Sequence, residues 1–236
     1  MLVVNWMSTK LVGLGPDDSL AQAMRLMKEN QIEHLPVIKD NKLVGIVSDR
    51  DVKRASASDA TSLEVHELSY LLTRVKVKDF MSPDPVTVHV HDSIEDAALL
   101  MLENKISALP VLDDREKVVA MLTQMDLFRA LVLLSGVIHG GVQFAVDLPD
   151  VPGSIKAPAD ILRKHGGKIV SIFTSYERVA PGRRLSYFRV KDLKPEDLEK
   201  VQKEMAAVGE PIYVLDTDTK KLNLLAPHKL ASLPEK

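Results

Sequence analysis

The first 135 residues alternate between short apolar runs and segments in which apolar residues recur at helical spacing. Runs at residues 11–14, 34–38 and 43–48 predict strands, because each is short and is bounded by polar turn residues. Between the first two runs, residues 19–30 predict a helix whose apolar face is formed by Leu20, Ala23, Met24 and Met27. A second helix is expected to follow residue 48 and to run to Arg54.

The same pattern returns about seventy-five residues later, so the chain contains an internal repeat. Strands are predicted at residues 86–90, 108–112 and 118–123, and a helix at residues 92–104. About twenty of fifty-one aligned positions are identical, with one extra residue, Arg115, in the second copy. Two copies are too few for a solenoid, so we expect them to pack on each other as one module. The segment between the copies predicts a polar loop and a short amphipathic helix with Leu63, His66, Leu68, Leu71 and Leu72.

After residue 136 the pattern changes, and several glycines mark the boundary. Further strands are predicted at residues 142–146, 168–176, 185–190 and 212–215. With helices that end at about residue 165 and at Gly209, the order is strand-helix-strand-strand-helix-strand, as in ferredoxin-like α+β folds. Pro152 and Gly153 are placed as a type II turn requires, and Pro158 fits only the first turn of a helix.

These patterns divide the chain into a first repeat, a linker with a short helix, a second repeat, a ferredoxin-like domain and a loose polar tail. Their expected bounds are residues 1–55, 56–78, 79–136, 137–216 and 217–236.

Composition narrows the class of protein. With 236 residues, of which 45% are hydrophobic, the chain can bury real cores. A net charge of −2 creates no field that favours nucleic acid or an anionic membrane. The absence of cysteine excludes a disulfide framework and thiolate chemistry. We see no signal peptide and no membrane-spanning segment, so we expect a soluble, cytoplasmic protein.

In each repeat the last residue of a predicted strand carries a hydroxyl group, and an aspartate follows three positions later. These pairs are Ser48 with Asp51 and Thr123 with Asp126. A helix that begins here would favour anions through its free N–H groups and the positive end of its dipole. The alternative interpretation is a capping box, in which the hydroxyl caps the helix and the aspartate reaches back to the backbone.

The element order, the Leu-Pro-Val strand and the ending Gly-h-h-Ser-x-x-Asp, where h is apolar, resemble the CBS domain, present twice as a CBS pair. The resemblance covers about residues 4–135. It implies an α/β sandwich of two β-α-β-β-α repeats with two clefts, which in many members bind adenosine nucleotides or related adenosyl compounds.

By this resemblance the two aspartates would accept hydrogen bonds from the ribose hydroxyls, and the two hydroxyl residues would lie beside the ribose-phosphate. Apolar members of each cleft would sandwich the adenine. The first cleft would contain Ile46, Ser48, Asp51, Val86 and Ser107, and the second Met121, Thr123, Asp126, Val12 and Glu33. The second copy departs from the first in having Ala120 in place of Gly45, and Glu33 would repel a phosphate.

Residues 141–216 resemble an ACT domain, a small regulatory module that often binds amino acids at a dimer interface. The resemblance rests on the element order and on Asp-x-Pro-Gly between the first strand and the first helix. It implies a ligand carboxylate held by the N–H groups after Gly153, with Asp150 beside it. An ordinary loop before a helix explains the same residues.

A CBS pair followed by an ACT domain resembles the acetoin-utilisation type of regulatory protein, the B component of that system, over nearly the whole chain. No phosphate loop, dinucleotide-binding glycine pattern or nucleophile elbow occurs, and no metal-ligand cluster is evident. We therefore expect a non-catalytic regulatory homodimer without metal or tightly bound cofactor. Its CBS clefts would sense an adenosine nucleotide, and its ACT-like domain would extend the dimer or bind a second metabolite. The alternative is a ligand-free structural dimer that presents a surface to a partner enzyme.

Overall fold

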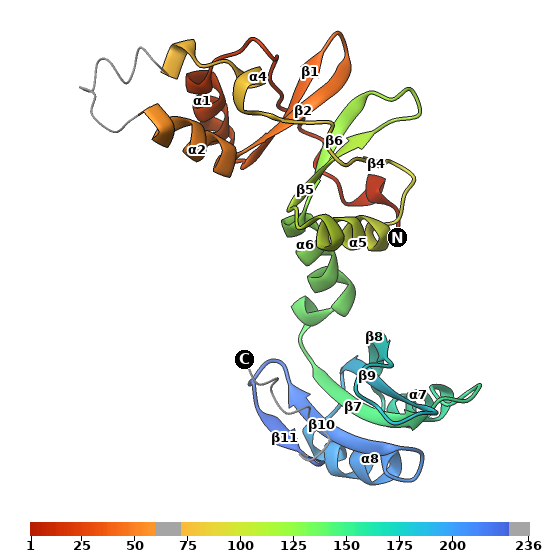
Figure 1. The fold of residues 1–236 in the computed structure, drawn as a ribbon. Helices are drawn as coiled ribbons and strands as arrows, with labels where there is room; N and C mark the ends of the chain where they lie inside the picture. Colours follow the sequence, from red (N-terminus) through yellow and green to blue (C-terminus); the bar gives the residue numbers. More distant parts are fainter. Residues whose placement is uncertain (60–71, 227–236) are drawn as a thin grey trace. The chain divides into compact units, whose positions relative to one another are not determined.

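A computed structural model describes residues 1–59 and 72–226. The chain forms two compact units, Met1–Phe128 and Arg129–Lys236, and helix α6 (Gln124–Ser135) passes from one to the other (Figure 1). The short amphipathic helix expected between the repeats falls on residues that lie outside those described. In the part of the chain that is described, no helix is long and apolar enough to cross a membrane.

The first unit contains two three-stranded sheets, one for each repeat. The first sheet has the order β1-β2-β3 and the second the order β4-β5-β6. Their strands are β1 (His34–Lys39), β2 (Lys42–Ser48), β3 (Ser82–Pro83), β4 (Val88–His89), β5 (Ala108–Leu112) and β6 (Val118–Thr123). The helices are α1 (Leu20–Asn30), α2 (Asp49–Asp59), α4 (Val77–Phe80) and α5 (Ile94–Asn104), with a 3-10 turn η1 (Val3–Asn5) at the start. The predicted hairpins and helices of both repeats are thus confirmed.

The first strand of each repeat is shorter than predicted. The run at residues 11–14 makes only an isolated parallel bridge between Leu14 and Val37, and the run at residues 86–90 is reduced to Val88–His89. Gly13, Gly15 and Pro16 surround Leu14, and glycine and proline both weaken a strand. Each run contributes one buried residue, Leu14 or Val88, and no full strand.

Helix α1 begins and ends as its sequence predicts. The Oγ of Ser19 accepts the N–H of Gln22 at 3.2 Å, and the chain leaves the helix through Gln31 in the left-handed region at φ 54°. The buried face consists of Leu20, Ala23 and Met27, whereas Met24 is 39% exposed. The prediction that Met24 belongs to the apolar face is wrong, because its position lies at the edge of the stripe.

The two repeats are joined by their lead segments, residues 1–8 and 75–83, each of which bonds to the other repeat. In the first segment the N–H of Val3 donates to the carbonyl of Asp92, and the N–H of Ser8 to that of Met121. In the second, the N–H of Val77 donates to the carbonyl of Asp18, and β3 pairs antiparallel with β2. Each repeat is therefore completed by chain that precedes the other repeat, which the sequence did not predict.

The pairing of β3 with β2 brings the two strands close together at Gly45. A Cβ atom added at Gly45 would lie 2.6 Å from the Sδ of Met81 and 3.0 Å from the carbonyl oxygen of Ser82. A side chain here would require Met81 and the backbone of Ser82 to move, so glycine suits this close approach of two strands. The second repeat has Ala120 at the equivalent position, and there the lead segment meets the sheet through an isolated bridge between Ser8 and Met121.

The second unit contains one five-stranded sheet with the order β11-β10-β7-β9-β8, in which all neighbours are antiparallel. Its elements are a 3-10 turn η2 (Val137–His139), β7 (Val142–Pro149), α7 (Lys156–Lys164), β8 (Lys168–Ser175), β9 (Arg183–Lys191), a 3-10 turn η3 (Pro195–Asp197), α8 (Leu198–Met205), β10 (Glu210–Asp216) and β11 (Leu222–Leu224). The predicted element order is present. The chain after residue 216 was expected to be loose, and β11 corrects this, because Leu222–Leu224 pairs with the edge strand β10.

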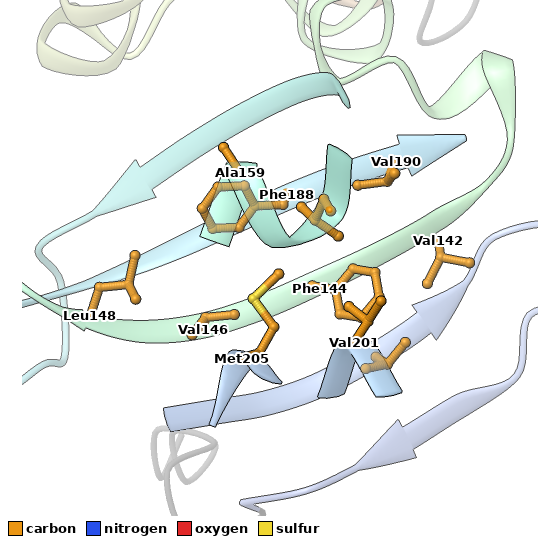
Figure 2. Packing of buried hydrophobic residues seen from close by; sticks show 11 residues of the cluster. Val142, Phe144, Val146, Leu148, Ala159, Phe188, Val190, Val201 and Met205 are labelled. Atoms are coloured by element: carbon orange, nitrogen blue, oxygen red, sulfur yellow. The ribbon is translucent and has the colours of Figure 1, made fainter. Parts of the chain in front are cut away.

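The core of the second unit lies between the sheet and helices α7 and α8. Figure 2 shows Phe144 and Phe188 on the sheet facing Ala159 of α7 and Met205 of α8. Pro158 stands in the first turn of α7, as predicted. The type II turn is also confirmed, since Gly153 has φ 83° and the N–H of Ser154 donates to the carbonyl of Val151.

We expect Leu162→Ala to lower the free energy of unfolding by about 2–5 kcal/mol, because it leaves a cavity in this core. Leu162 is fully buried, whereas Leu222 is 50% exposed. The matched change Leu222→Ala should alter stability by about 0.5 kcal/mol or less. Urea denaturation followed by circular dichroism measures both, and equal effects would contradict the assigned core.

Candidate functional site

The strand-to-helix junctions of the two repeats have the same hydrogen-bond geometry. Oδ2 of Asp51 accepts the backbone N–H of Ser48 at 2.9 Å and its hydroxyl at 2.6 Å, while the Oγ of Ser48 accepts the N–H of Asp51 at 3.2 Å. Thr123 and Asp126 repeat these contacts at 2.9, 2.7 and 3.3 Å. The capping-box interpretation is therefore confirmed in both copies.

The capping boxes use part of the anion-binding capacity expected at these helix N-termini. In α2 the N–H of Asp49 donates to the carbonyl of Glu33, and the N–H of Asp51 donates to Ser48. In α6 the N–H of Gln124 donates likewise to the carbonyl of Ser107. Two of the first three N–H groups of α2 are thus engaged within the protein, so a phosphate here would depend more on cationic side chains.

A cleft of about 790 Å³ opens beside the first capping box, within the size range of small-molecule sites. Its walls come from both repeats. The first repeat contributes Glu33, His34, Ile46, Ser48, Asp49, Arg50, Asp51 and Lys53. The second repeat and its lead segment contribute Ser82, Asp84, Pro85, Val86, Asn104, Lys105, Ile106, Ser107, Ala108 and Gln124.

Ile46, Ser48, Asp51, Val86 and Ser107, the residues assigned to the first cleft from the sequence, all line this space. Asp51 is 8% exposed, so its carboxylate is buried at the wall. Glu33, which was assigned to the second cleft, also lines the first one.

The residues assigned to the second cleft are less clearly gathered. Thr123 and Asp126 form their capping box, and Met121 is 9% exposed on β6. Val12 packs as a half-buried residue against the hydrophobic core of the first repeat. The grouping of Val12 and Glu33 with these three residues stays a prediction.

His34 lines the cleft and was missed from the sequence. Its Nε2 lies 3.0 Å from the Oγ of Ser107, which links the two repeats at the wall of the cleft. Burial lowers the pKa of His34 below its usual value of 6.5, although the charges of Glu33, Asp51 and Asp49 act in the opposite direction. The signal in the sequence was its place directly before Leu-Pro-Val, where the second copy has Ala108.

The loop between β7 and α7 carries the other assigned residues, Asp150 and Gly153. The N–H groups of Ser154 and Lys156 donate to the carbonyls of Val151 and Gly153, so two donors expected to hold a ligand carboxylate are already engaged. The sequence did not point to Arg184, which donates to the Oγ of Ser154 at 2.6 Å and lies 3.8 Å from Asp150.

The model of the CBS domain family matches residues 3–58 and 77–133. The chain is also 32% identical over 133 residues to a CBS domain-containing protein of Dictyostelium discoideum, and the match covers 56% of this chain and 92% of that protein. This chain belongs to the CBS domain family. Its two repeats are CBS domains, and together they form a CBS pair.

Further relatives and solved structures also match the part of this chain that forms the CBS pair. The chloroplastic CBS domain-containing protein CBSX2 of Arabidopsis thaliana is 35% identical over 133 residues, which cover 49% of this chain and 56% of CBSX2. A crystal structure of CBSX2 in complex with AMP aligns with 57% of this chain and 98% of that chain, at 33% identity and a TM-score of 0.48. A structure named for an acetoin utilization protein (AcuB) of Vibrio cholerae aligns with 59% of this chain and 96% of that one, at 25% identity and a TM-score of 0.49. The expected resemblance of the whole chain to the acetoin-utilisation type stays a prediction.

The buried imidazole of His34 should make stability depend on pH. The unfolded chain takes up a proton near pH 6.5 and the folded CBS pair only at lower pH, so this residue stabilises the fold at higher pH and less as the pH falls below 6.5. We expect unfolding free energy to fall more between about pH 7.5 and pH 5.5 in the wild type than in His34→Gln. Urea titrations at both pH values measure this, with His91→Gln, an exposed histidine, as the control. Equal losses in the wild type and His34→Gln would contradict the burial of a neutral imidazole.

Proposed function

We propose that this protein is a non-catalytic regulator that binds an adenosine nucleotide in the Ser48/Asp51 cleft of its CBS pair. One observation carries the proposal: a cleft between the repeats is lined by the capping-box aspartate together with apolar and cationic side chains. No group of three or more potential metal ligands occurs within residues 1–59 and 72–226. We assign the site no metal and no tightly bound cofactor.

Each class of side chain has a role in this proposal. The carboxylate of Asp51 accepts hydrogen bonds from the ribose hydroxyls, and these bonds are charge-assisted. Ile46 and Val86, from different repeats, enclose the adenine. Arg50 and Lys105 supply positive charge for a phosphate, because both line the cleft and the N-terminus of α2 is partly engaged. Glu33 and Asp84 add negative charge to the same walls, which favours a ligand with few phosphates.

Ligand binding would regulate the protein through the arrangement of its repeats. The walls of the cleft belong to both CBS domains. A bound nucleotide therefore favours the arrangement of the two domains in which both walls contact it. We assign the second site, with Val12, Glu33, Met121, Thr123 and Asp126, to the same ligand class at lower affinity. The reason is that its capping box repeats the first without a comparable set of gathered walls.

We propose that residues 137–216 form a ferredoxin-like, ACT-like domain, within the domain bounds expected from the sequence. The order β7-α7-β8-β9-α8-β10 and the strand order β10-β7-β9-β8 support it, because this is the ferredoxin-like arrangement. Asp150 and Gly153 are its candidate amino-acid contacts. The engaged N–H groups beside them favour a role in extending a dimer over a second ligand site.

We propose a cytoplasmic homodimer of the acetoin-utilisation type that contacts its copy through the second CBS domain. Leu99 and Leu102 on α5 and Met125 and Phe128 on α6 are between 55% and 71% exposed. The aligned positions of the first repeat hold the cations Arg25, Lys28, Arg50 and Lys53. Matched positions that differ in this way point to an apolar contact surface, because isolated exposed leucines are common but a repeat-specific set is not.

Replacing apolar residues of the second repeat by the lysines at the aligned positions of the first repeat should dissociate this dimer. We expect the double variant Leu102→Lys, Phe128→Lys to sediment as a monomer of 26.1 kDa, while the wild type sediments at twice that mass. The control is Met24→Lys, at an exposed apolar position of the first repeat. A double variant that remains dimeric would refute the assigned surface, and a monomeric wild type would refute the dimer.

The nucleotide site is tested by binding to Asp51→Ala. At about a hundred times its dissociation constant a ligand adds roughly 2.7 kcal/mol of stability, which raises the melting temperature by several degrees. A panel of AMP, ADP, ATP and S-adenosylmethionine identifies the ligand. Asp51→Ala should then bind it at least tenfold more weakly in calorimetry, since it loses charge-assisted bonds.

The control Asp114→Ala removes a carboxylate whose side chain is 80% exposed and should bind as the wild type does. A panel without any response would favour the alternative function, a structural dimer that presents a surface to a partner enzyme.

A further inference from the structure

The acceptor positions of Asp51 are nearly all in use. Oδ2 accepts two hydrogen bonds from Ser48, and Oδ1 accepts one from the guanidinium of Arg54 at 2.9 Å. A carboxylate offers about four lone-pair positions. One acceptor position therefore remains for a ligand.

A ribose presents two neighbouring hydroxyls, and gripping both requires two acceptor positions on the same carboxylate. One of the three donors already bound to Asp51 must then leave. The two bonds from Ser48 belong to the capping box that starts α2, so losing either destabilises the helix.

Arg54 is the donor that leaves most easily. Its side chain is 73% exposed, whereas that of Asp51 is 12% exposed, so the released guanidinium returns to water. Ion pairs with an exposed partner contribute little, because solvent screens them. Arg54 also lies three residues after Asp51 on the same helix, so its release requires only a change of rotamer.

We propose that Arg54 is a positioning residue that competes with the ligand's hydroxyls for Asp51, and so sets the affinity and the diol selectivity of the cleft. This inference rests on the proposed function of the same site. It leads to an uncommon expectation: removing a cation strengthens binding, and salt strengthens it as well. Salt screens the Arg54–Asp51 pair but leaves a neutral nucleoside unaffected.

The test uses adenosine, a neutral probe, with isothermal titration calorimetry on the full-length protein. We expect Arg54→Gln to bind adenosine roughly two- to fivefold more tightly than the wild type, because this factor corresponds to the free energy of an exposed ion pair. Arg54→Lys, which keeps the charge, should stay close to the wild type. Arg25→Gln is the matched control, because Arg25 is an exposed arginine paired with Glu29 on α1.

Two further readouts separate competition from a merely structural effect. 2′,3′-Dideoxyadenosine, which has no diol, should gain nothing from Arg54→Gln. Raising sodium chloride from about 0.05 to about 0.5 M should tighten adenosine binding to the wild type and leave Arg54→Gln unchanged.

Three results would overturn the inference. If Arg54→Gln binds adenosine equally or more weakly than the wild type, Arg54 does not compete, and the proposed function stands. If the dideoxy compound gains as much as adenosine, the effect does not concern the hydroxyls. If neither protein binds any member of the nucleotide panel or adenosine, the proposed function fails and this inference with it.

Discussion

The reciprocal bonding of the two lead segments is the constraint on which the CBS pair depends. Buried N–H and C=O groups need partners, and each sheet of the pair obtains some of them from the chain that precedes the other repeat. The repeats therefore cannot separate without leaving polar backbone unpaired. This limits how far Ser48 on one side of the cleft can move from Val86 and Ser107 on the other. A cleft with walls from two repeats is useful as a binding site only if such a constraint holds the walls together.

The capping box and the proposed ligand site use different oxygens of the same Asp51 carboxylate, so they are not competing explanations of the sequence. Ser48 holds Asp51 by two hydrogen bonds, and this fixes the carboxylate at the wall of the cleft without a ligand. A side chain that is already ordered loses little further entropy when it binds. Helix capping thus prepares the acceptor in advance. In the second repeat Thr123 holds Asp126 by the same two hydrogen bonds.

The sequence predicted what depends on local chemistry and missed what depends on distant partners. The cap at Ser19, the turn at Gly153 and the place of Pro158 in the first turn of α7 followed from neighbouring residues. Strand β3 could not be predicted, because two residues that include a proline show no alternation. The contact of His34 with Ser107 joins residues 73 positions apart, and no local pattern encodes it. In the cleft the assigned residues of the first site came from the family resemblance, whereas the placement of Glu33 and Lys105 on its walls depends on how the two repeats pack.

The crossing of the lead segments also bears on how such a chain can originate. A chain with one repeat would lack the segment that completes its own sheet, but its lead segment could complete the sheet of a second copy. Two such chains would therefore pair each other's backbone groups. Duplication and fusion would turn that intermolecular exchange into an intramolecular one without altering a contact. The fused chain would then assemble at any dilution, because the second half is always present at high effective concentration. Fusion also lets the two halves differ, and in this chain one half has lysines and arginines where the other has leucine, methionine and phenylalanine.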